Sequence, residues 1–513
     1  MREGKETAIS TGRLDNILSC RQTDVLKYVA VLQGCGAIGQ GADTTSLFFC
    51  LPENKTAGDN GSEVMASRKI SQHPPDKPVV PTGGKFLSDG PVLELIRIPS
   101  GELNFLIWNG KSARTTAQFI WHDETFVPLR VDPAILRSLH LPSNIAGYGS
   151  TRKLFTEIST LISRVTQAGD GVVLLLTFYV FATWLADCLP IAPFVWIIVP
   201  PTTTASPLAQ LLSLLCRHAF AVNDISSARF HSLPMDLQPT LLTEVFRPTR
   251  RVLNLLRASN RHGAFVAAGG KAIDPFCAKI VFAPEPLRDP ASAGFPLELV
   301  LTPTREYVPL MNSSEAARVG AEFQAKLLHY RLLNWAKVRT PAFDLSQFTV
   351  PVQELAYSLA ASIVDDDELQ SQIVPFLTPL DREVRVDLAS QLPAIVLEAL
   401  LARCHSTTGQ KFPVGDLTAD VNTILRGRKE MLEVSPEEIG WALRRLGLHR
   451  GFISGGRKGV VLQSDVRQKI HDLAAGYGVH TLRELPAKID CPLCAALGLP
   501  WKFGTHGHAR ESK

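Results

Sequence analysis

One long apolar segment limits the fold of this chain more than any other feature. Residues 172–200 are almost wholly apolar, but Asp187, Pro190 and Pro193 interrupt the middle of the run. A charge at the centre of a membrane span costs roughly 2.5–3.5 kcal/mol, and proline breaks a helix there. We therefore expect no membrane span. The segment instead predicts a buried helix at about 172–187 followed by a short buried strand at about 194–199.

Length and composition favour a multidomain globular protein. The chain has 513 residues, 45% of them hydrophobic and 20% charged, which predicts two or three domains with ordinary cores. The net charge is only +4, so binding to nucleic acid would require a local basic patch. Nine cysteines behind a polar N-terminus without a signal peptide predict reduced thiols and a cytoplasmic location.

Strand-like and helical runs alternate through the centre of the chain. Apolar strand-like runs occur at 195–199, 240–242, 264–268, 279–283 and 297–301, with helical stretches between them. This alternation predicts a parallel sheet that is covered on both faces. A hairpin at 92–108, a strand at 116–121 and a helix at 151–166 precede the sheet, and helices at 313–337 and 352–404 follow it.

The strand at 194–199 leads into a loop with the layout of a phosphate-binding loop but not its residues. Such a loop needs glycines whose N–H groups approach phosphate, a lysine for the outer phosphates and a Ser or Thr for magnesium. Thr202 and Thr204 occupy glycine positions, Ala205 the lysine position and Ser206 the magnesium position. A second strand ends in Glu244, at a magnesium position, and Val245 stands where a catalytic glutamate usually lies.

Further segments around this loop carry a resemblance to a known family; they are residues 181–193, 255–260, 275–281 and 330–335. Across residues 90–480 the chain resembles a bacterial family of unknown function with a P-loop ATPase-like core, found alone or fused to phage and plasmid primase-helicases. The resemblance implies an α/β P-loop NTPase-like fold and an ATP-dependent role on DNA. Where the family tends to carry an arginine after the last strands, this chain has Ala293-Gly294-Phe295.

The degenerate loop residues favour one of two functions. The first is a non-hydrolysing, ATPase-like DNA-binding or adaptor protein of mobile-element origin, with no cofactor. The alternative is an active ATPase, a helicase or primase accessory, that binds ATP and magnesium in an unusual way. Under that alternative, Lys271 or Lys279 could supply the charge that Ala205 lacks.

The region 393–463 predicts a winged helix. Two helices precede a third, for which Ser435 is the N-cap, Pro436 the first turn and Glu438 the partner in a capping box. A hairpin with a basic, glycine-rich tip follows. Basic residues on the third helix and the hairpin are where the phosphates of double-stranded DNA would lie. The predicted DNA-binding residues are Arg444, Arg445, Arg450, Arg457 and Lys458. Winged helices also serve as protein-contact modules, and the protein partner is not predicted.

Three weaker patterns remain. Cys491, Cys494, His506 and His508 could bind zinc as a knuckle, or could be part of a loose tail. The acidic run at 365–368 is typical of the start of a solvated helix rather than of a metal site. A Gly-x-Gly-x-x-Gly pattern at 34–39 lacks the helix that a dinucleotide site needs, since residues 44–50 look extended.

These observations divide the chain into seven parts. They are a degenerate N-terminal segment (1–51), a linker (52–90), a small β-rich unit (91–150), the ATPase-like domain (151–312), a helical domain (313–392), the winged helix (393–480) and the tail (481–513).

Overall fold

The computed structural model describes residues 78–479 except for short gaps, together with three N-terminal strands and residue 493. The gaps are residues 89, 167, 224–229, 231, 247, 269–270, 288–295, 303–306, 407–410, 431, 449–450 and 454–456. The chain divides into two units, Met1–Asp76 and Lys77–Lys513. In the first unit, β1 (Thr7–Ser10), β2 (Ile38–Gly39) and β3 (Ser46–Phe49) form an antiparallel sheet in the order β1-β3-β2. The extended conformation expected near residues 44–50 is therefore present in β3.

The second unit begins with a β-rich region that starts earlier than its composition predicted. The predicted linker was wrong for residues 79–86, which form β4 (Val79–Thr82) and β5 (Gly84–Phe86). Pro81 is tolerated in β4 because this strand lies at the edge of its sheet, beside β10 (Glu124–Pro128). Gly84 has a φ of 147°, a conformation that favours glycine.

The predicted hairpin is present as β6 (Val92–Arg97) and β7 (Leu103–Trp108), which pair in register from Val92↔Trp108 to Arg97↔Leu103. The strand expected at 116–121 is split into β8 (Ala113–Thr116) and β9 (Phe119–Trp121). A short helix, α3 (Pro133–Ser138), follows β10. The two small sheets are β5-β6-β7-β8 and β4-β10-β9.

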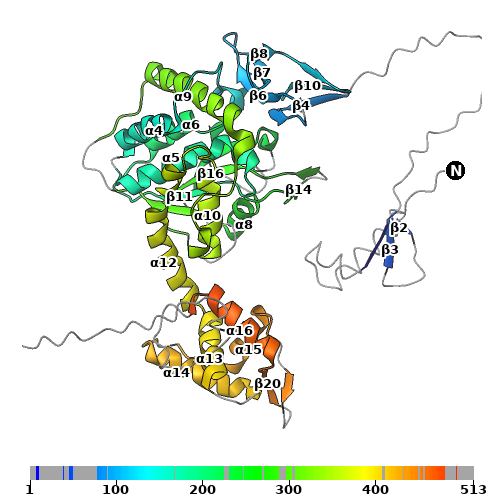
Figure 1. Cartoon of the computed structure of the whole chain (residues 1–513), viewed down its shortest axis with the longest axis vertical. Coiled ribbons are helices and arrows are strands. Elements are labelled where there is room, and N and C mark those ends of the chain that lie inside the picture. Colours follow the sequence, from blue (N-terminus) through cyan, green and yellow to red (C-terminus); the bar gives the residue numbers. More distant parts are fainter. Residues whose placement is uncertain are drawn as a thin grey trace, which may run out of the picture. The chain divides into compact units, whose positions relative to one another are not determined.

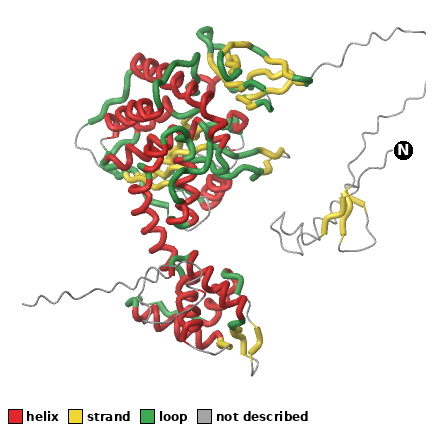
Figure 2. The backbone as a smooth tube through the Cα atoms, in the orientation of Figure 1, coloured by secondary structure: helices red, strands yellow, loops and turns green. Residues whose placement is uncertain are grey.

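The centre of the chain forms a five-stranded parallel sheet with helices, in the order β12-β13-β16-β11-β17. The strands are β11 (Phe194–Ile198), β12 (Ala219–Ala221), β13 (Thr240–Glu244), β16 (Ala278–Ala283) and β17 (Leu297–Val300). Helices α4 (Thr151–Thr166), α5 (Asp170–Trp184), α6 (Ser206–Leu215) and α8 (Arg250–Ala258) surround it (Figures 1 and 2). The parallel sheet predicted from the alternating pattern is confirmed.

Two details of the predicted sheet were wrong. The run at 264–268 is not in the parallel sheet, because β14 (Val266–Ala268) pairs with β15 (Lys271–Ile273) as an antiparallel hairpin. Two glycines in the sequence separate these strands, which is a strong hairpin signal. The fifth strand of the sheet is instead β12, at the edge opposite β17; its three residues are too few to show a strand pattern.

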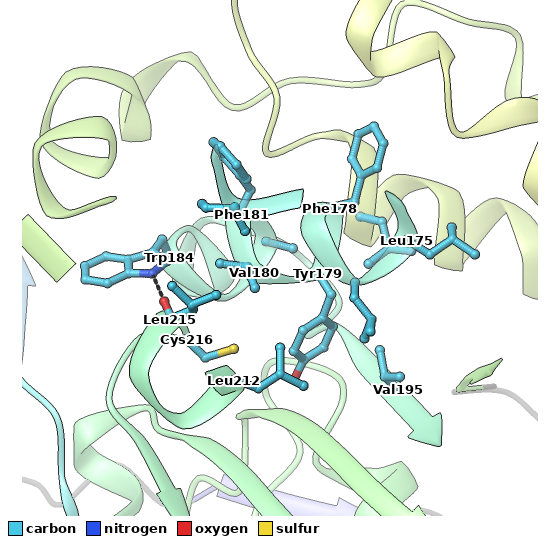
Figure 3. Close-up of a cluster of buried hydrophobic side chains, with 14 of the residues drawn as sticks. Leu175, Phe178, Tyr179, Val180, Phe181, Trp184, Val195, Leu212, Leu215 and Cys216 are labelled. Carbon is cyan, nitrogen blue, oxygen red and sulfur yellow. Dashed lines mark hydrogen bonds between the residues drawn. The ribbon is translucent and has the colours of Figure 1, made fainter. Parts of the chain in front are cut away.

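The interrupted apolar segment folds as a helix and a strand, as predicted. α5 buries nearly its whole length and is followed by a single 3-10 turn, Ala186–Cys188, before β11 begins. In Figure 3, the Tyr179 ring of α5 lies near Leu212 of α6 and Val195 of β11, whereas Phe178 and Phe181 point to the other side of the helix. Trp184 Nε1 donates to Leu215 O at 2.8 Å. No helix among the described residues is long and apolar enough to cross a membrane.

The side chains of β11 alternate between two hydrophobic clusters. Val195 and Ile197 join the cluster that includes α4, α5 and α6, whereas Phe194 and Trp196 join a second cluster. This second cluster contains residues of α8 and of the β6–β7 hairpin. Both faces of the sheet are therefore covered, one of them partly by the β-rich region rather than by helices alone.

Helices make up most of the remaining chain. They are α9 (Ser313–Asn334), α10 (Val350–Ala360), α11 (Asp367–Ser371), α12 (Val374–Ser390), α13 (Leu392–Ser406), α14 (Val414–Gly427), α15 (Pro436–Arg445) and α16 (Ser464–Gly476). We call residues 392–476 the C-terminal unit. Within it β18 (Lys411–Pro413), β19 (Gly451–Ile453) and β20 (Arg457–Val461) form an antiparallel sheet in the order β18-β20-β19. The helices and hairpin expected there are present, and β18 was not anticipated.

Candidate functional site

The loop of residues 199–206, which we call the β11–α6 loop, lies at the carboxyl edge of the parallel sheet. In open α/β sheets this edge is where ligands bind. β16 separates β11 from β13, and the pairs Ile198↔Ala283 and Glu244↔Phe282 place the ends of the three strands at a similar level. A cavity of about 420 Å³ between them is lined by the loop and by Glu244, Val245, Phe246, Phe282, Ala283 and Pro284. The structure thus brings Ser206 and Glu244, the two predicted magnesium-site residues, to one cavity.

Two of the first N–H positions of α6 are unavailable to a ligand. Ser206 N donates to Thr204 Oγ1 at 3.3 Å, and Pro207, within the first turn, has no N–H to donate. Thr203 N donates to Pro200 O at 2.9 Å, so the loop also turns back on itself. A phosphate bound at a helix N-terminus needs N–H groups directed at it. At Ser206 this N–H group is already bonded to Thr204, and at Pro207 it does not exist.

The backbone of this loop also lacks the conformation that glycines provide. Among the described residues with positive φ, none belongs to the β11–α6 loop. Thr202 and Thr204 keep the backbone in conformations that β-branched residues adopt readily. Ala205 is buried and joins the hydrophobic cluster around α5 and α6. The position of the missing lysine thus packs against the core and also borders the cavity, to which alanine contributes no charge.

The lining of this edge offers little positive charge. The described residues that line the cavity include no Lys, Arg or His. A second cavity, of about 450 Å³, lies against residues 201–204 of the same loop and is lined also by Thr166, Leu301 and Tyr307; its described lining again includes no basic residue. Val245, at the position of the catalytic glutamate, packs against the second hydrophobic cluster. Ser206 and Glu244 are oxygen ligands of the kind that magnesium prefers, and the described lining offers no basic side chain beside them.

Lys279 is too far from the loop to replace the missing lysine, so that expectation was wrong. It pairs with Phe194 at the amino end of β11, whereas the loop follows Ile198 at the other end, about 13 Å away along the strand. Its Nζ is buried and donates to Cys277 O at 2.6 Å and Ser259 O at 3.2 Å. Burial lowers the pKa of Lys279 to about 8, against a smaller opposing effect of Cys277. Lys271 lies in the β14–β15 hairpin, and its side chain is outside the described residues.

A buried cluster of charges joins the β-rich region to the helices. Arg331 of α9 donates from Nε to Glu94 Oε1 at 2.5 Å and through both terminal nitrogens to Asp187 at 2.6 Å. Arg217 donates to the other oxygen of Glu94 at 3.2 Å. The Arg331 guanidinium lies 4.7 Å from the Phe86 ring centroid. Burial alone would raise the pKa of Asp187, but Arg331 and Arg217 hold it at about 2.

This cluster was missed as a unit by the sequence analysis, although its members interrupt apolar segments. Asp187 breaks the run at 172–200, and Arg331 lies among the apolar residues of α9. Because its four groups bind one another deep in the core, the cluster is structural. It does not face either cavity lining.

In the C-terminal unit, α15 begins as predicted. Ser435 Oγ accepts from Glu438 N, and the Glu438 carboxylate accepts from Ser435 N at 2.8 Å, which completes the capping box. The hydrogen bonds that the Glu438 carboxylate accepts from Ser435 N and from Ser435 Oγ lower the pKa of Glu438. Ile439, Ala442 and Leu443 are buried, as is Leu446 after the helix ends.

The basic residues of this unit divide into exposed and internally paired groups. Arg444, Arg445 and Lys458 are exposed, and Arg457 begins β20. Arg450 and the side chain of Arg457 lie outside the described residues. Arg428 is paired with Glu398 at 2.5 Å and is therefore not part of the exposed basic surface. A residue that the sequence analysis missed is Trp441, which is 64% exposed and has the Arg444 guanidinium 5.0 Å from its ring centroid.

The acidic run and the tail have different outcomes. Asp366 caps α11 by accepting from Leu369 N and is paired with Arg152 at 2.7 Å, in agreement with the interpretation as a helix start. No group of metal-ligating side chains occurs among the residues that the structure describes. The predicted zinc ligands Cys491, Cys494, His506 and His508 lie outside those residues, as do Ala293, Gly294 and Phe295.

Comparisons with known proteins place the chain near several solved structures. No protein-family model and no curated protein matches it. It is similar to the apo C-terminal region of NrS-1, at 10% identity and a TM-score of 0.34, over 72% of this chain and 96% of that chain. It is also similar to a full-length MCM homolog from Methanopyrus kandleri, at 13% identity and a TM-score of 0.29, over 57% and 77% of the two chains. It is similar to the JCV helicase at 13% identity and a TM-score of 0.22, over 46% of this chain and 62% of that chain. These scores are too low to carry over a fold or a function.

Proposed function

We propose that this protein is a non-hydrolysing, ATPase-like DNA-binding or adaptor protein of mobile-element origin, related to phage and plasmid primase-helicases. The observation that carries the proposal is the closed β11–α6 loop. Thr204 accepts the Ser206 N–H, Pro207 has none, and Ala205 is buried where a lysine would extend. A sheet that keeps its carboxyl-edge cavity but loses its phosphate ligands fits a scaffold better than an enzyme.

In this proposal the C-terminal unit is a winged helix that binds double-stranded DNA. Helices α13, α14 and α15, with a three-stranded antiparallel sheet and a fourth helix, α16, support this assignment. The exposed residues Arg444, Arg445 and Lys458 are suited to phosphate contacts, and we include Arg450 and Arg457 on sequence grounds. Because the loop, in this proposal, has no phosphate cradle, no nucleotide cofactor is proposed. Separately, on sequence grounds, we propose that the protein acts in the cytoplasm. Zinc in the tail stays a prediction, to be tested by the metal content of a Cys491→Ser, Cys494→Ser variant.

ATP binding tests the proposal directly. We expect the purified full chain to bind no ATP at concentrations below about 1 mM, measured by calorimetry with magnesium present. Its ATP turnover should not exceed that of a buffer control, because neither charge neutralisation nor a water-orienting acid is provided by the loop or by Val245. ATPase activity that disappears in Glu244→Ala would contradict the proposal.

The alternative, an active ATPase with an unusual nucleotide site, is favoured by one observation. Ser206 and Glu244 line the same cavity, so a magnesium ion between them would be near a bound nucleotide. If this alternative holds, magnesium-dependent ATP binding should be present in the wild-type chain and be weakened by both Ser206→Ala and Glu244→Ala. Equal lack of binding by all three proteins would exclude it.

A further inference from the structure

The exposed face of α15 carries three kinds of side chain in a fixed order. Glu437 and Glu438 lie at its start, Trp441 in the middle and Arg444 and Arg445 at its end, and all five are exposed. The opposite face is buried in the hydrophobic core of the C-terminal unit. Residues three and four apart share one face of a helix, so the acids, the ring and the arginines form one continuous surface.

The indole ring of Trp441 lies in the middle of this surface and is exposed enough to stack on another ring. Trp441 is 64% exposed although tryptophan is usually well buried. The Arg444 guanidinium covers one face of the indole at 5.0 Å from the ring centroid, so the ring is held from one side. The other face is left for a second planar group. Nucleic-acid bases stack on aromatic side chains irrespective of sequence, and neighbouring basic groups hold the strand.

The charges along α15 do not suit contact between an ordinary duplex and the whole length of this helix. Arg444 and Arg445 suit phosphates at the end of the helix, whereas Glu437 and Glu438 would repel phosphates at its start. An unpaired base is neutral and can lie beside Trp441 without bringing a second phosphate strand to the acids. Within a duplex, away from its ends, the faces of the bases are by contrast covered by their neighbours, and only their edges are accessible.

We propose that α15 binds DNA at a junction between double and single strands, with an unpaired base stacked on Trp441 and the adjoining phosphates on Arg444 and Arg445. This inference rests on the proposed DNA binding of the C-terminal unit and specifies its substrate. Trp441 acts as a stacking residue that recognises the unpaired base. The arginines hold the phosphates without distinguishing between paired and unpaired DNA.

Binding of the full chain to matched oligonucleotides tests the proposal. The probes are a blunt duplex, the same duplex with a single-stranded overhang, and that overhang with an abasic site next to the duplex, all measured by fluorescence anisotropy at one salt concentration. The wild type should prefer the overhang to the blunt duplex by about fivefold or more, because base stacking on an aromatic ring is worth a factor of at least that size. Trp441→Ala should remove this preference and leave blunt-duplex binding unchanged, while Trp441→Phe should keep part of it.

The abasic probe separates stacking from other roles of Trp441. It should lower wild-type affinity as much as Trp441→Ala does, and the variant should not distinguish it from the intact overhang. If Trp441→Ala keeps the wild-type preference while Arg444→Glu with Arg445→Glu weakens binding to every probe, the stacking proposal fails and DNA binding stands. If the wild type binds no probe at low salt, both fail, and the surface would then be a protein contact.

Discussion

The core and the C-terminal unit each place an arginine over an aromatic ring, in opposite surroundings. Arg331 lies over Phe86 at 4.7 Å and is buried, with its guanidinium bonded to Glu94, Asp187 and the Trp184 carbonyl. Arg444 lies over Trp441 at 5.0 Å and is exposed, and it makes no salt bridge within the described part of the chain. The first arginine uses four of its five N–H donors within the core, whereas no hydrogen bond from the second is found in the described part of the chain. The comparison indicates that the core's buried charges hold the fold together, and that exposed charge for a ligand lies in the C-terminal unit.

The largest expected effect comes from removing the buried arginine. Arg331→Met leaves the Glu94 and Asp187 carboxylates buried without their main partner, and breaking one side of such a buried pair costs about 3–5 kcal/mol. The core's unfolding transition in urea, followed by tryptophan fluorescence, should move to clearly lower concentration. Arg444→Met is the matched control and should change stability by no more than about 0.5 kcal/mol. Similar shifts for the two variants would contradict the comparison.

A second buried cation gives the core a dependence on pH. Burial lowers the pKa of Lys279 to about 8 from an ordinary 10.5, so the folded state releases its proton at a lower pH than the unfolded state does. Between these two values the unfolded state binds more protons, and stability therefore rises with pH. The rise is at most roughly 3 kcal/mol, and below pH 8 the penalty of burying the charge is constant.

Comparing variants isolates the contribution of Lys279. The free energy of unfolding of the wild type, minus that of Lys279→Met, should increase as the pH is raised from 8 to about 10. Cys277, whose Sγ is 3.9 Å from the lysine Nζ, has a pKa raised by burial and would also titrate in an alkaline range. Cys277→Ser should therefore retain the rise with pH. A constant difference between wild type and Lys279→Met would show that the lysine does not lose its proton there.

Exposed charge in the C-terminal unit should affect DNA rather than stability. Arg444→Glu with Arg445→Glu should weaken binding to all DNA probes by about tenfold or more and reduce the slope of log affinity against log salt by about 2. The buried face of α15 is untouched, so its helix should remain folded. Arg164→Glu with Arg382→Glu changes the net charge equally at exposed sites of the core and should have much less effect. Equal losses for both pairs would mean that net charge alone governs binding.

The sequence predicted features that depend on neighbouring residues and missed those that depend on distant ones. The capping box of α15 and the break of the apolar segment at Asp187 could be read because their partners lie within a few positions. The cluster of Glu94, Asp187, Arg217 and Arg331 joins residues up to 237 positions apart, and no periodicity reveals such a pairing. The degenerate loop was visible as residue types, but the sequence analysis did not single out Pro207. The hydrogen bond from Ser206 N to Thr204 required coordinates.

The smallest expected effect comes from adding the missing charge to the core. Ala205→Lys restores the residue type of a phosphate-binding loop, but Thr204 still accepts the Ser206 N–H and Pro207 still offers none. A lysine alone supplies a charge without the backbone cradle. Ala205 packs in the core and also lines the carboxyl-edge cavity, so the new side chain can reach the cavity but finds no N–H groups there to share a phosphate with. We therefore expect no ATP binding below about 1 mM by calorimetry in Ala205→Lys. The double variant with Thr204→Gly frees the Ser206 N–H, but Pro207 still offers none and Thr202 still occupies the other glycine position, so we expect the same result. The arginine surface of α15 is unchanged, so DNA binding by both variants should equal that of the wild type. Submillimolar ATP binding by the single variant would show instead that the loop opens readily and that charge was the only property it had lost.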